Sequence, residues 1–254
     1  MIFFKHIIFA IYSIFWYLKN YFFIKKYFFK SKIINYKIKY FHLWKPNTQY
    51  FSGYINNQKI FIKFSKKEYL KREFEAINIL NDMKNSYNFF PIILKTELDL
   101  KIPNLVFKYI DGTPLNLLLK NKIKFSNDLI LKISDAFEDI IIKLHSCNFI
   151  HRDVRPHNII LDEKGNVHLI DFTFLIDIKR KNHFLIELPL NSKNMKLLLR
   201  LGHGYNNYLG MWDDAFSFMK ILLDIGADEG LKIKISKYLN KLTYKLPSKL
   251  VNKL

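Results

Sequence analysis

The stretch HRDVRPHNIILDEKGNVHLIDF, residues 151–172, constrains this chain more than any other feature. Asp153 is followed five residues later by Asn158 and thirteen residues after that by Asp171. Apolar residues flank the first carboxylate on both sides, and Lys164-Gly165-Asn166 is typical of a tight hairpin between two short strands. The pattern therefore predicts a loop anchored at both ends by buried apolar residues, and a hairpin whose second strand brings Asp171 back beside this loop. The three side chains can then lie close together.

These residue types suit the positioning of a phosphoryl group. Asn158 and Asp171 supply hard oxygen ligands for Mg²⁺, which takes its remaining ligands from water and phosphates. Asp153, free of the metal, can accept a proton from a hydroxyl group. Lys63, on an upstream strand, can reach phosphate oxygens if a helical carboxylate such as Glu73 holds it.

Two motifs in this stretch resemble those of the protein-kinase-like superfamily. HRDVRPHN is similar to the catalytic loop H-R-D-x-x-x-x-N, and IDF followed by Thr173 is similar to D-F-G with its glycine replaced. The resemblance implies ATP and Mg²⁺ as cofactors and transfer of the γ-phosphoryl group to a hydroxyl. It also implies that Asp153 is catalytic, with Arg155 contacting phosphate beside it, and that Asn158 and Asp171 bind the metal.

The resemblance extends to residues outside this stretch. Lys63 in FIKF stands where the family has its strand lysine, and Glu73 stands where the family has the helical glutamate that pairs with it; Glu75 is a weaker candidate. LVFKYIDG resembles the hinge, which implies that Phe107 is the gatekeeper and that backbone groups of Lys108 and Ile110 bind adenine. Asp214 in WDDAFSF resembles the buried aspartate that holds the catalytic loop by its backbone.

The expected fold is α+β: a two-lobed protein-kinase-like fold with a β-rich N-lobe at 33–110 and a reduced helical C-lobe at 111–254. An N-terminal amphipathic helix at 1–32 is expected as a separate segment. The local patterns predict strands at 59–64, 92–98 and 104–110, helices at 66–80 and 127–145, and turns at 45–47, 56–57 and 111–112.

Residues 1–32 combine aromatic and aliphatic residues with lysines. The longest uncharged run, 7–18, is too short to span a bilayer. Polar residues recur about every seven positions (Lys5 and His6, Ser13, Lys19 and Asn20, Lys26), which predicts one narrow polar stripe on a helix. We expect a helix in a membrane interface with its lysines at anionic head groups. The alternative is a helix packed on the domain behind it.

The formal charge of +19 is confined to the two ends of the chain. Residues 1–67 contain 13 lysines and no acid, residues 230–254 contain 7 lysines and no acid, and the part between them is nearly neutral. No known nucleic-acid-binding motif accompanies this charge, so we expect no nucleic-acid partner. His151, His157 and His168 have no cysteine beside them and fit no zinc pattern, and His151 is expected to be a packed loop residue.

Two departures from the family pattern affect the expected acceptor. The segment NTQYFSGYINN contains only Gly53 where the family has a glycine-rich loop, and only 29 residues follow Ile225. A short C-lobe favours a membrane-linked sugar such as the lipopolysaccharide core, whereas the arginine of HRD favours a protein serine or threonine. A soluble small molecule is a third acceptor, and a pseudokinase scaffold is an alternative of another class. The expected location is the cytoplasm, peripheral on the cytoplasmic face of the inner membrane.

Overall fold

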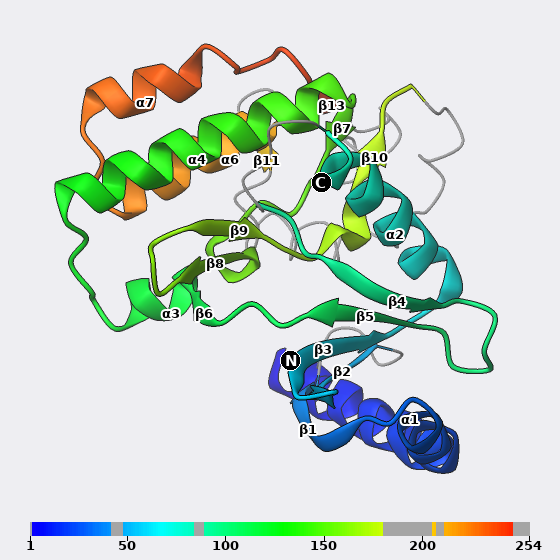
Figure 1. Cartoon of the computed structure of the whole chain (residues 1–254). Helices are drawn as coiled ribbons and strands as arrows, with labels where there is room; N and C mark the ends of the chain where they lie inside the picture. The colour runs from blue at the N-terminus through cyan, green and yellow to red at the C-terminus, as the bar shows by residue number, and fades with distance from the viewer. Residues whose placement is uncertain (1, 42–47, 84–88, 180–204, 207–210, 246–254) are drawn as a thin grey trace. The chain divides into compact units, whose positions relative to one another are not determined.

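The protein is described here by a computed structural model, which covers residues 2–41, 48–83, 89–179, 205–206 and 211–245. The chain divides into two compact units (Figure 1). Unit 1 consists of Met1–Ile77 and Pro91–Ile110, and unit 2 of Asn78–Phe90 and Asp111–Leu254. The division after Ile110 is where the sequence places the boundary between the lobes. The N-terminal helix, expected as a separate segment, groups with unit 1, and residues 78–90 group with unit 2.

Unit 1 is built on a five-stranded antiparallel sheet in the order β1-β2-β3-β5-β4. Its strands are β1 (Ile34–Phe41), β2 (Gln49–Ile55), β3 (Gln58–Phe64), β4 (Ile93–Glu97) and β5 (Asn104–Lys108). Its helices are α1 (Ile2–Lys30) and the first part of α2 (Lys67–Asn81). The predicted turn at Asn56-Asn57 joins β2 to β3, and both residues have positive φ values, of 48° and 63°, a conformation that asparagine tolerates well. The predicted turn at 45–47 lies outside the described residues.

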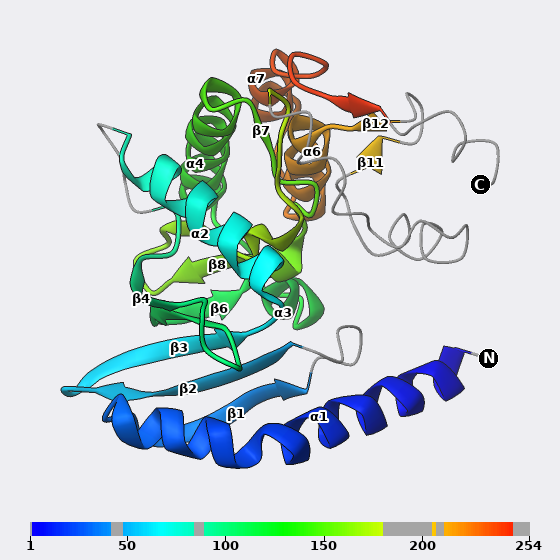
Figure 2. The ribbon, with the colours of Figure 1, turned by 90° about the vertical axis from the view of Figure 1, so that its right-hand side faces the viewer.

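Helix α1 closes one face of this sheet. Ile24 and Phe28 are each 1% exposed and share a core with residues of β2, β3 and β5. The ring of Phe28 lies 5.3 Å from that of Phe51 and 6.0 Å from that of Phe64. Figure 2 shows α1 running lengthwise beside β1 and β2, with its N-terminal part extending past the ends of these strands. The alternative interpretation of residues 1–32, a helix packed on the domain, is therefore correct for the part of α1 from Ser13 to Phe28.

The predicted single polar stripe on this helix is wrong. Ser13 is fully buried, its carbonyl accepts a hydrogen bond from Gln49 Nε2, and Asn20 is half-buried and donates to the carbonyl of Trp16. Lys19 and Lys26 are exposed. Neighbouring residues in a helix are rotated by about 100° relative to each other, so the pairs that looked equivalent in the sequence face different environments.

Unit 2 contains the remaining elements. They are β6 (Gly112–Pro114), α3 (Leu115–Lys120), α4 (Asn127–Ser146), β7 (Phe149–Ile150), the 3₁₀ helix η1 (Pro156–Asn158), β8 (Ile159–Asp162), β9 (Val167–Leu169), the 3₁₀ helix η2 (Phe172–Phe174), β10 (Ile176–Asp177), β11 (Tyr205–Asn206), β12 (Met211–Trp212), α6 (Asp214–Asp224), α7 (Glu229–Ser236) and β13 (Tyr244–Lys245). The strands form three small antiparallel sheets, in the orders β6-β8-β9, β10-β7 and β11-β12-β13.

Helix α4 is the central support of unit 2. Ser126 caps its N-terminus by accepting a hydrogen bond from the backbone N–H of Leu129. Apolar residues with helical spacing form one buried face of α4: Ile130, Ile133, Phe137, Ile141 and Leu144. Phe137 packs against Phe218 of α6, with ring centroids 4.4 Å apart. The helix thus forms a rigid base for the loop that follows it.

The predicted turn at Asp111-Gly112 leads directly into β6. Gly112 pairs with Asp162 of β8, and a Cβ at this position would lie 2.4 Å from the carbonyl oxygen of Leu161. Only glycine allows the two strands to approach so closely. The predicted hairpin at 164–166 is present, and Gly165 has a φ of +73°.

Candidate active site

The backbone of the catalytic loop is held by a buried carboxylate. Oδ2 of Asp214 accepts the N–H of His151 at 2.6 Å, and Oδ1 accepts the N–H of Arg152 at 3.1 Å. Burial raises the pKa of Asp214 to about 7, although the two backbone hydrogen bonds act in the opposite direction. Arg152 has a φ of +63°, a strained conformation for a non-glycine residue. The carboxylate of Asp214 therefore fixes a backbone path that the loop would not adopt alone.

His151 is a packing residue of this loop, as expected from the sequence. Its ring is fully buried and lies 4.7 Å from the ring of Phe172, edge to face. The partners of its two nitrogens assign the neutral tautomer: Nε2 donates to the carbonyl of Ile170 at 3.2 Å, and Nδ1 accepts the N–H of Asp153 at 3.3 Å. Across the described residues, no group of three or more His, Cys, Asp or Glu side chains is arranged to hold a metal.

Two later residues of the same loop, Arg155 and Asn158, contact the carboxylate of Asp153. Its Oδ2 accepts a hydrogen bond from Asn158 Nδ2 at 2.8 Å, and its Oδ1 lies 3.2 Å from Nε of Arg155. Asp153 is 4% exposed. The predicted proximity of Asp153 and Asn158 is confirmed. Arg155, which the resemblance assigns to phosphate, forms an ion pair with Asp153 in this structure.

Asn158 and Asp171 are brought together by the backbone. The N–H of Ile170 donates to the carbonyl of Asn158 at 2.9 Å, which places Asp171 next to the loop. The amide nitrogen of Asn158 donates to both the carbonyl and the carboxylate of Asp153, each at 2.8 Å. The amide oxygen is therefore the atom that this residue can offer to a cation. An amide oxygen and a carboxylate are a donor set that fits Mg²⁺.

Thr173 is a residue of the site to which the sequence assigned no role. Its Oγ1 donates to Oδ1 of Asp171 at 2.5 Å, and the side chain is 1% exposed. Asp171 has a φ of +63° and a ψ of +70°, a conformation in which a local hydrogen bond helps to hold a non-glycine residue. The replacement of the usual glycine thus adds a contact that orients the predicted metal ligand.

We expect Thr173→Ala to raise the Mg²⁺ concentration needed for half-maximal activity by about tenfold, because a hydrogen bond to a charged group contributes about 1.5–3 kcal/mol. Thr173→Ser retains the hydroxyl and serves as the matched control. Initial rates measured across a Mg²⁺ titration at saturating nucleotide test this expectation. Identical titrations for the alanine and serine variants would show that the hydroxyl does not orient Asp171.

In unit 1, the structure selects one of the two candidate glutamates. Nζ of Lys63 on β3 donates to Oε2 of Glu73 on α2 at 2.7 Å, and both residues are 2% exposed. Glu75 instead lies 3.9 Å from the exposed Lys71. The ring of Tyr50, on the neighbouring strand, has its centroid 5.9 Å from Nζ of Lys63. The pairing of Lys63 with Glu73 is the ion pair that the kinase resemblance implies.

Because this ion pair is buried, we expect a substitution of Lys63 to lower the stability of the fold as well as the rate. Lys63→Met leaves the carboxylate of Glu73 buried without the lysine, which typically costs 3–5 kcal/mol. We therefore expect a markedly lower melting temperature for Lys63→Met and a partial recovery in Lys63→Met/Glu73→Gln. A melting curve measured without nucleotide tests this. Equal melting temperatures for the wild type and Lys63→Met would contradict it.

The predicted hinge residues lie at the end of β5. Phe107 is 5% exposed, and its ring lies 6.3 Å from that of Phe61. The N–H of Lys108 donates to the carbonyl of Ile92 at 2.9 Å, so its own carbonyl is the backbone group left for the adenine contact that the resemblance implies. Ile110 is the last residue of unit 1.

Gly53 does not belong to a phosphate-binding loop. It lies within β2, paired with Ile60. A Cβ at this position would lie 3.0 Å from Cγ2 of Ile33 and 3.2 Å from the carbonyl oxygen of Ile34. The close approach of the chain entering β1 therefore accounts for this glycine, which is a correction to the interpretation from the sequence. Residues 42–47, which join β1 to β2, lie outside the described part of the chain.

Comparison with known proteins decides the family. A family model described as "Protein kinase domain" matches residues 54–194, more than half of the chain. This chain belongs to the protein kinase domain family. The kinase is 31% identical over 121 residues to the probable serine/threonine-protein kinase glkA of Dictyostelium discoideum. The aligned segment is 46% of this chain and 24% of that protein, so the kinase spans about a quarter of the relative's length.

Family membership confirms the α+β kinase fold expected from the sequence. The comparisons support the expected activity class, a phosphotransferase with an alcohol group as acceptor. The comparisons give no support to the lipopolysaccharide core as that acceptor and favour the alternative, a protein serine or threonine.

Proposed function

We propose that this kinase transfers the γ-phosphoryl group of ATP to serine or threonine side chains of proteins. The observation that carries the proposal is the geometry around Asp153, whose carboxylate is buried, oriented by Asn158 and paired with Arg155. The name of the relative in Dictyostelium discoideum supports a protein as acceptor. The first interpretation, a glycolipid acceptor, remains an outcome of the test below.

In the proposed mechanism Asp153 accepts the proton of the attacking hydroxyl. The hydrogen bond from Asn158 directs the carboxylate, and Asp214 keeps the loop backbone in place so that the carboxylate does not have to reorganise during the reaction. Arg155, beside Asp153, contributes a positive charge where negative charge develops on the phosphoryl oxygens.

Asn158 and Asp171 would hold Mg²⁺, which when bound neutralises phosphate charge. Lys63, oriented by Glu73, binds phosphate oxygens of the nucleotide. Backbone groups of Lys108 and Ile110 bind adenine beside Phe107. The presence of the whole set argues against a pseudokinase.

The test uses the full-length protein with γ-labelled ATP and Mg²⁺. Three acceptors are offered separately: peptides with a single serine or threonine, the same peptides with tyrosine, and a glycolipid extract. We expect label in the serine and threonine peptides, at a rate that Asp153→Asn abolishes. Label that appears only in glycolipid would replace the proposal with the membrane-sugar kinase. Nucleotide binding without transfer to any acceptor would identify a pseudokinase.

A further inference from the structure

Helix α1 has two apolar faces, and only one of them is used by the fold. The inner face supplies Ile24, Tyr27 and Phe28 to the core of unit 1. Among the α1 side chains that the structure describes, those opposite this face are exposed, although they are also large and apolar. We call this set the outer stripe; it consists of Ile8, Ile11, Phe15, Leu18, Phe22 and Phe29.

The outer stripe runs without interruption from Ile8 to Phe22, and Lys25 and Lys26 occupy the turn between Phe22 and Phe29. Its members from Ile8 to Phe22 are spaced alternately by three and four residues, and Phe29 follows two turns later, so they share one side of the helix. Phe22 is 80% exposed and Phe29 is 87% exposed. Single exposed apolar residues are ordinary, but a row of this length marks an interaction surface.

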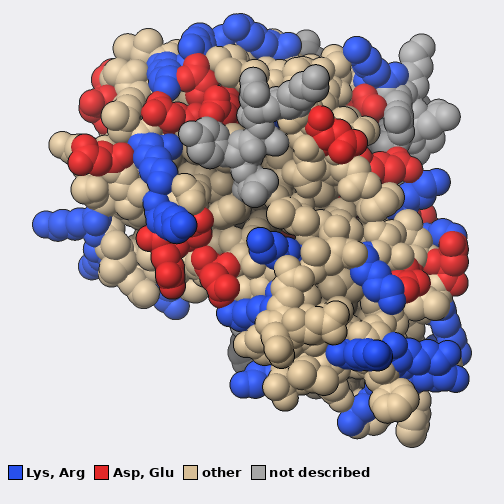
Figure 3. Space-filling model, in the orientation of Figure 1, with Lys and Arg blue, Asp and Glu red and all other residues tan. Residues whose placement is uncertain are grey.

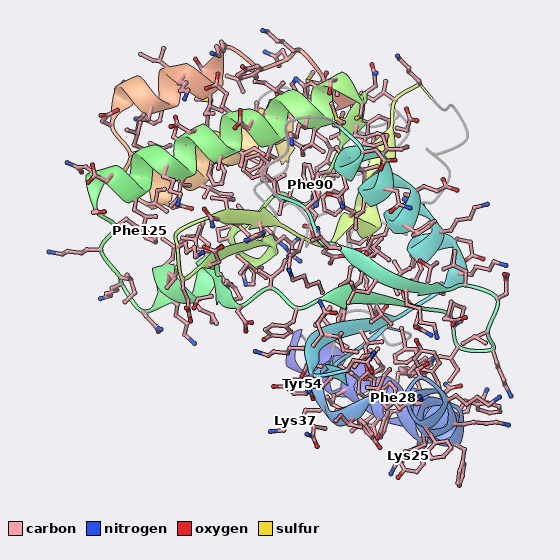
Figure 4. All side chains as sticks on the ribbon, in the orientation of Figure 1. Lys25, Phe28, Lys37, Tyr54, Phe90 and Phe125 are labelled. Atoms are coloured by element: carbon pink, nitrogen blue, oxygen red, sulfur yellow. The ribbon has the colours of Figure 1, made fainter. Side chains whose placement is uncertain are left out.

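Lysines border the outer stripe, and acids are absent. Lys19, Lys26 and Lys30 are exposed along one edge of it, and the first acidic residue of the chain is Glu68. Lys25, labelled in Figure 4, is also exposed, and its Nζ lies 5.3 Å from the ring centroid of Tyr21 and 6.0 Å from that of Tyr36 in β1. In Figure 3 the part of the surface formed by α1 and β1, at the bottom of the view, shows lysines and uncharged residues and no acids.

We propose that the outer stripe binds the surface of an anionic lipid bilayer, with α1 lying in the plane of the interface. An apolar row bordered by cations matches the acyl chains and the anionic head groups of such a surface. A second copy of α1 could cover the apolar side chains of the outer stripe, but its charge is not complementary. Two such helices would bring lysines together, and α1 has no acidic residue to pair with them. Among the described residues, no helix combines the length and hydropathy needed to cross a bilayer.

This arrangement differs from both alternatives that the sequence offered. The helix stays packed on the sheet of unit 1, and part of its apolar surface remains exposed. Its inner face joins the sheet of unit 1 and its outer face binds lipid. Removing residues 1–32 is therefore an unsuitable test of membrane binding, because it also removes Ile24 and Phe28 from the core.

Substitutions on the outer face separate lipid binding from folding. Full-length protein is sedimented with phosphatidylcholine vesicles, with and without phosphatidylglycerol. Phe22→Ser/Phe29→Ser is expected to lower the binding constant at least tenfold and to leave the melting temperature unchanged, because both rings are exposed. Lys19→Gln/Lys26→Gln/Lys30→Gln is expected to weaken binding to anionic vesicles roughly fivefold for each lysine, with little effect on neutral ones.

The matched control is Lys120→Gln/Lys122→Gln/Lys124→Gln, which removes the same charge from exposed positions of unit 2. It is expected to bind anionic vesicles as the wild type does. Equal loss of binding in the two lysine variants would show a net-charge effect and would overturn the proposal. Failure of the wild type to bind anionic vesicles would also overturn it, as would a dimer in solution that Phe22→Ser/Phe29→Ser converts to a monomer.

Discussion

Asp153→Asn is expected to retain nucleotide binding and to lose about 10²–10⁴ of turnover. The amide preserves the shape of the carboxylate but cannot take the proton of the acceptor hydroxyl. It also removes the negative charge that pairs with Arg155, so some loss of orientation adds to the chemical effect. Phosphoryl transfer to a serine peptide, measured beside nucleotide affinity, separates the two quantities.

The control for this variant is Asp128→Asn, the same chemical change at an exposed position in the first turn of α4. We expect it to retain full activity. A rate for Asp153→Asn within a few-fold of the wild type would remove Asp153 from the role of base. A variant that fails to bind nucleotide would instead show that the carboxylate supports the structure of the loop.

Asp171→Ala is expected to abolish the Mg²⁺-dependent part of ATP binding. Asn158 alone offers one neutral oxygen to a hard dication, and its amide nitrogen is already bound to Asp153. Calorimetric titrations with ATP, with and without Mg²⁺, measure the effect. In the wild type the metal should tighten binding, and in Asp171→Ala the two titrations should coincide.

Asp139→Ala removes a carboxylate from an exposed position of α4 and serves as the control. It should show the same metal dependence as the wild type. Tightening of ATP binding by Mg²⁺ in Asp171→Ala, to the wild-type extent, would exclude Asp171 as a ligand. A wild type that binds ATP equally well with and without the metal would favour a pseudokinase.

The proximity of the proposed catalytic residues could be predicted because they are local in sequence. Asp153 and Asn158 are five residues apart on one loop, and a two-stranded hairpin returns the chain to Asp171. Few conformations satisfy so short a connection, so spacing alone largely determines proximity. The pairing of Lys63 with Glu73 was predictable for the same reason, since a strand and the first turns of the next helix connect them.

Features that depend on distant neighbours could not be predicted. Gly53 looked like a remnant of a phosphate-binding loop because its sequence context does not show the chain before β1 packing against it. The three-residue strand β6 exists only because β8, about fifty residues later, is there to pair with it. The hydrogen bond of Thr173 required the unusual backbone conformation of Asp171, which no propensity reveals.

The two-faced packing of α1 has a consequence for how this helix can change in length during evolution. Each inserted residue turns all preceding residues by about 100° around the helix axis. One insertion between Leu18 and Phe22 would carry Ile11, Phe15 and Leu18 away from the side that bears Phe22 and Phe29, while Ile24 and Phe28 stayed in the core. Insertions and deletions inside this segment should therefore survive only in steps of about seven residues, which restore the phase.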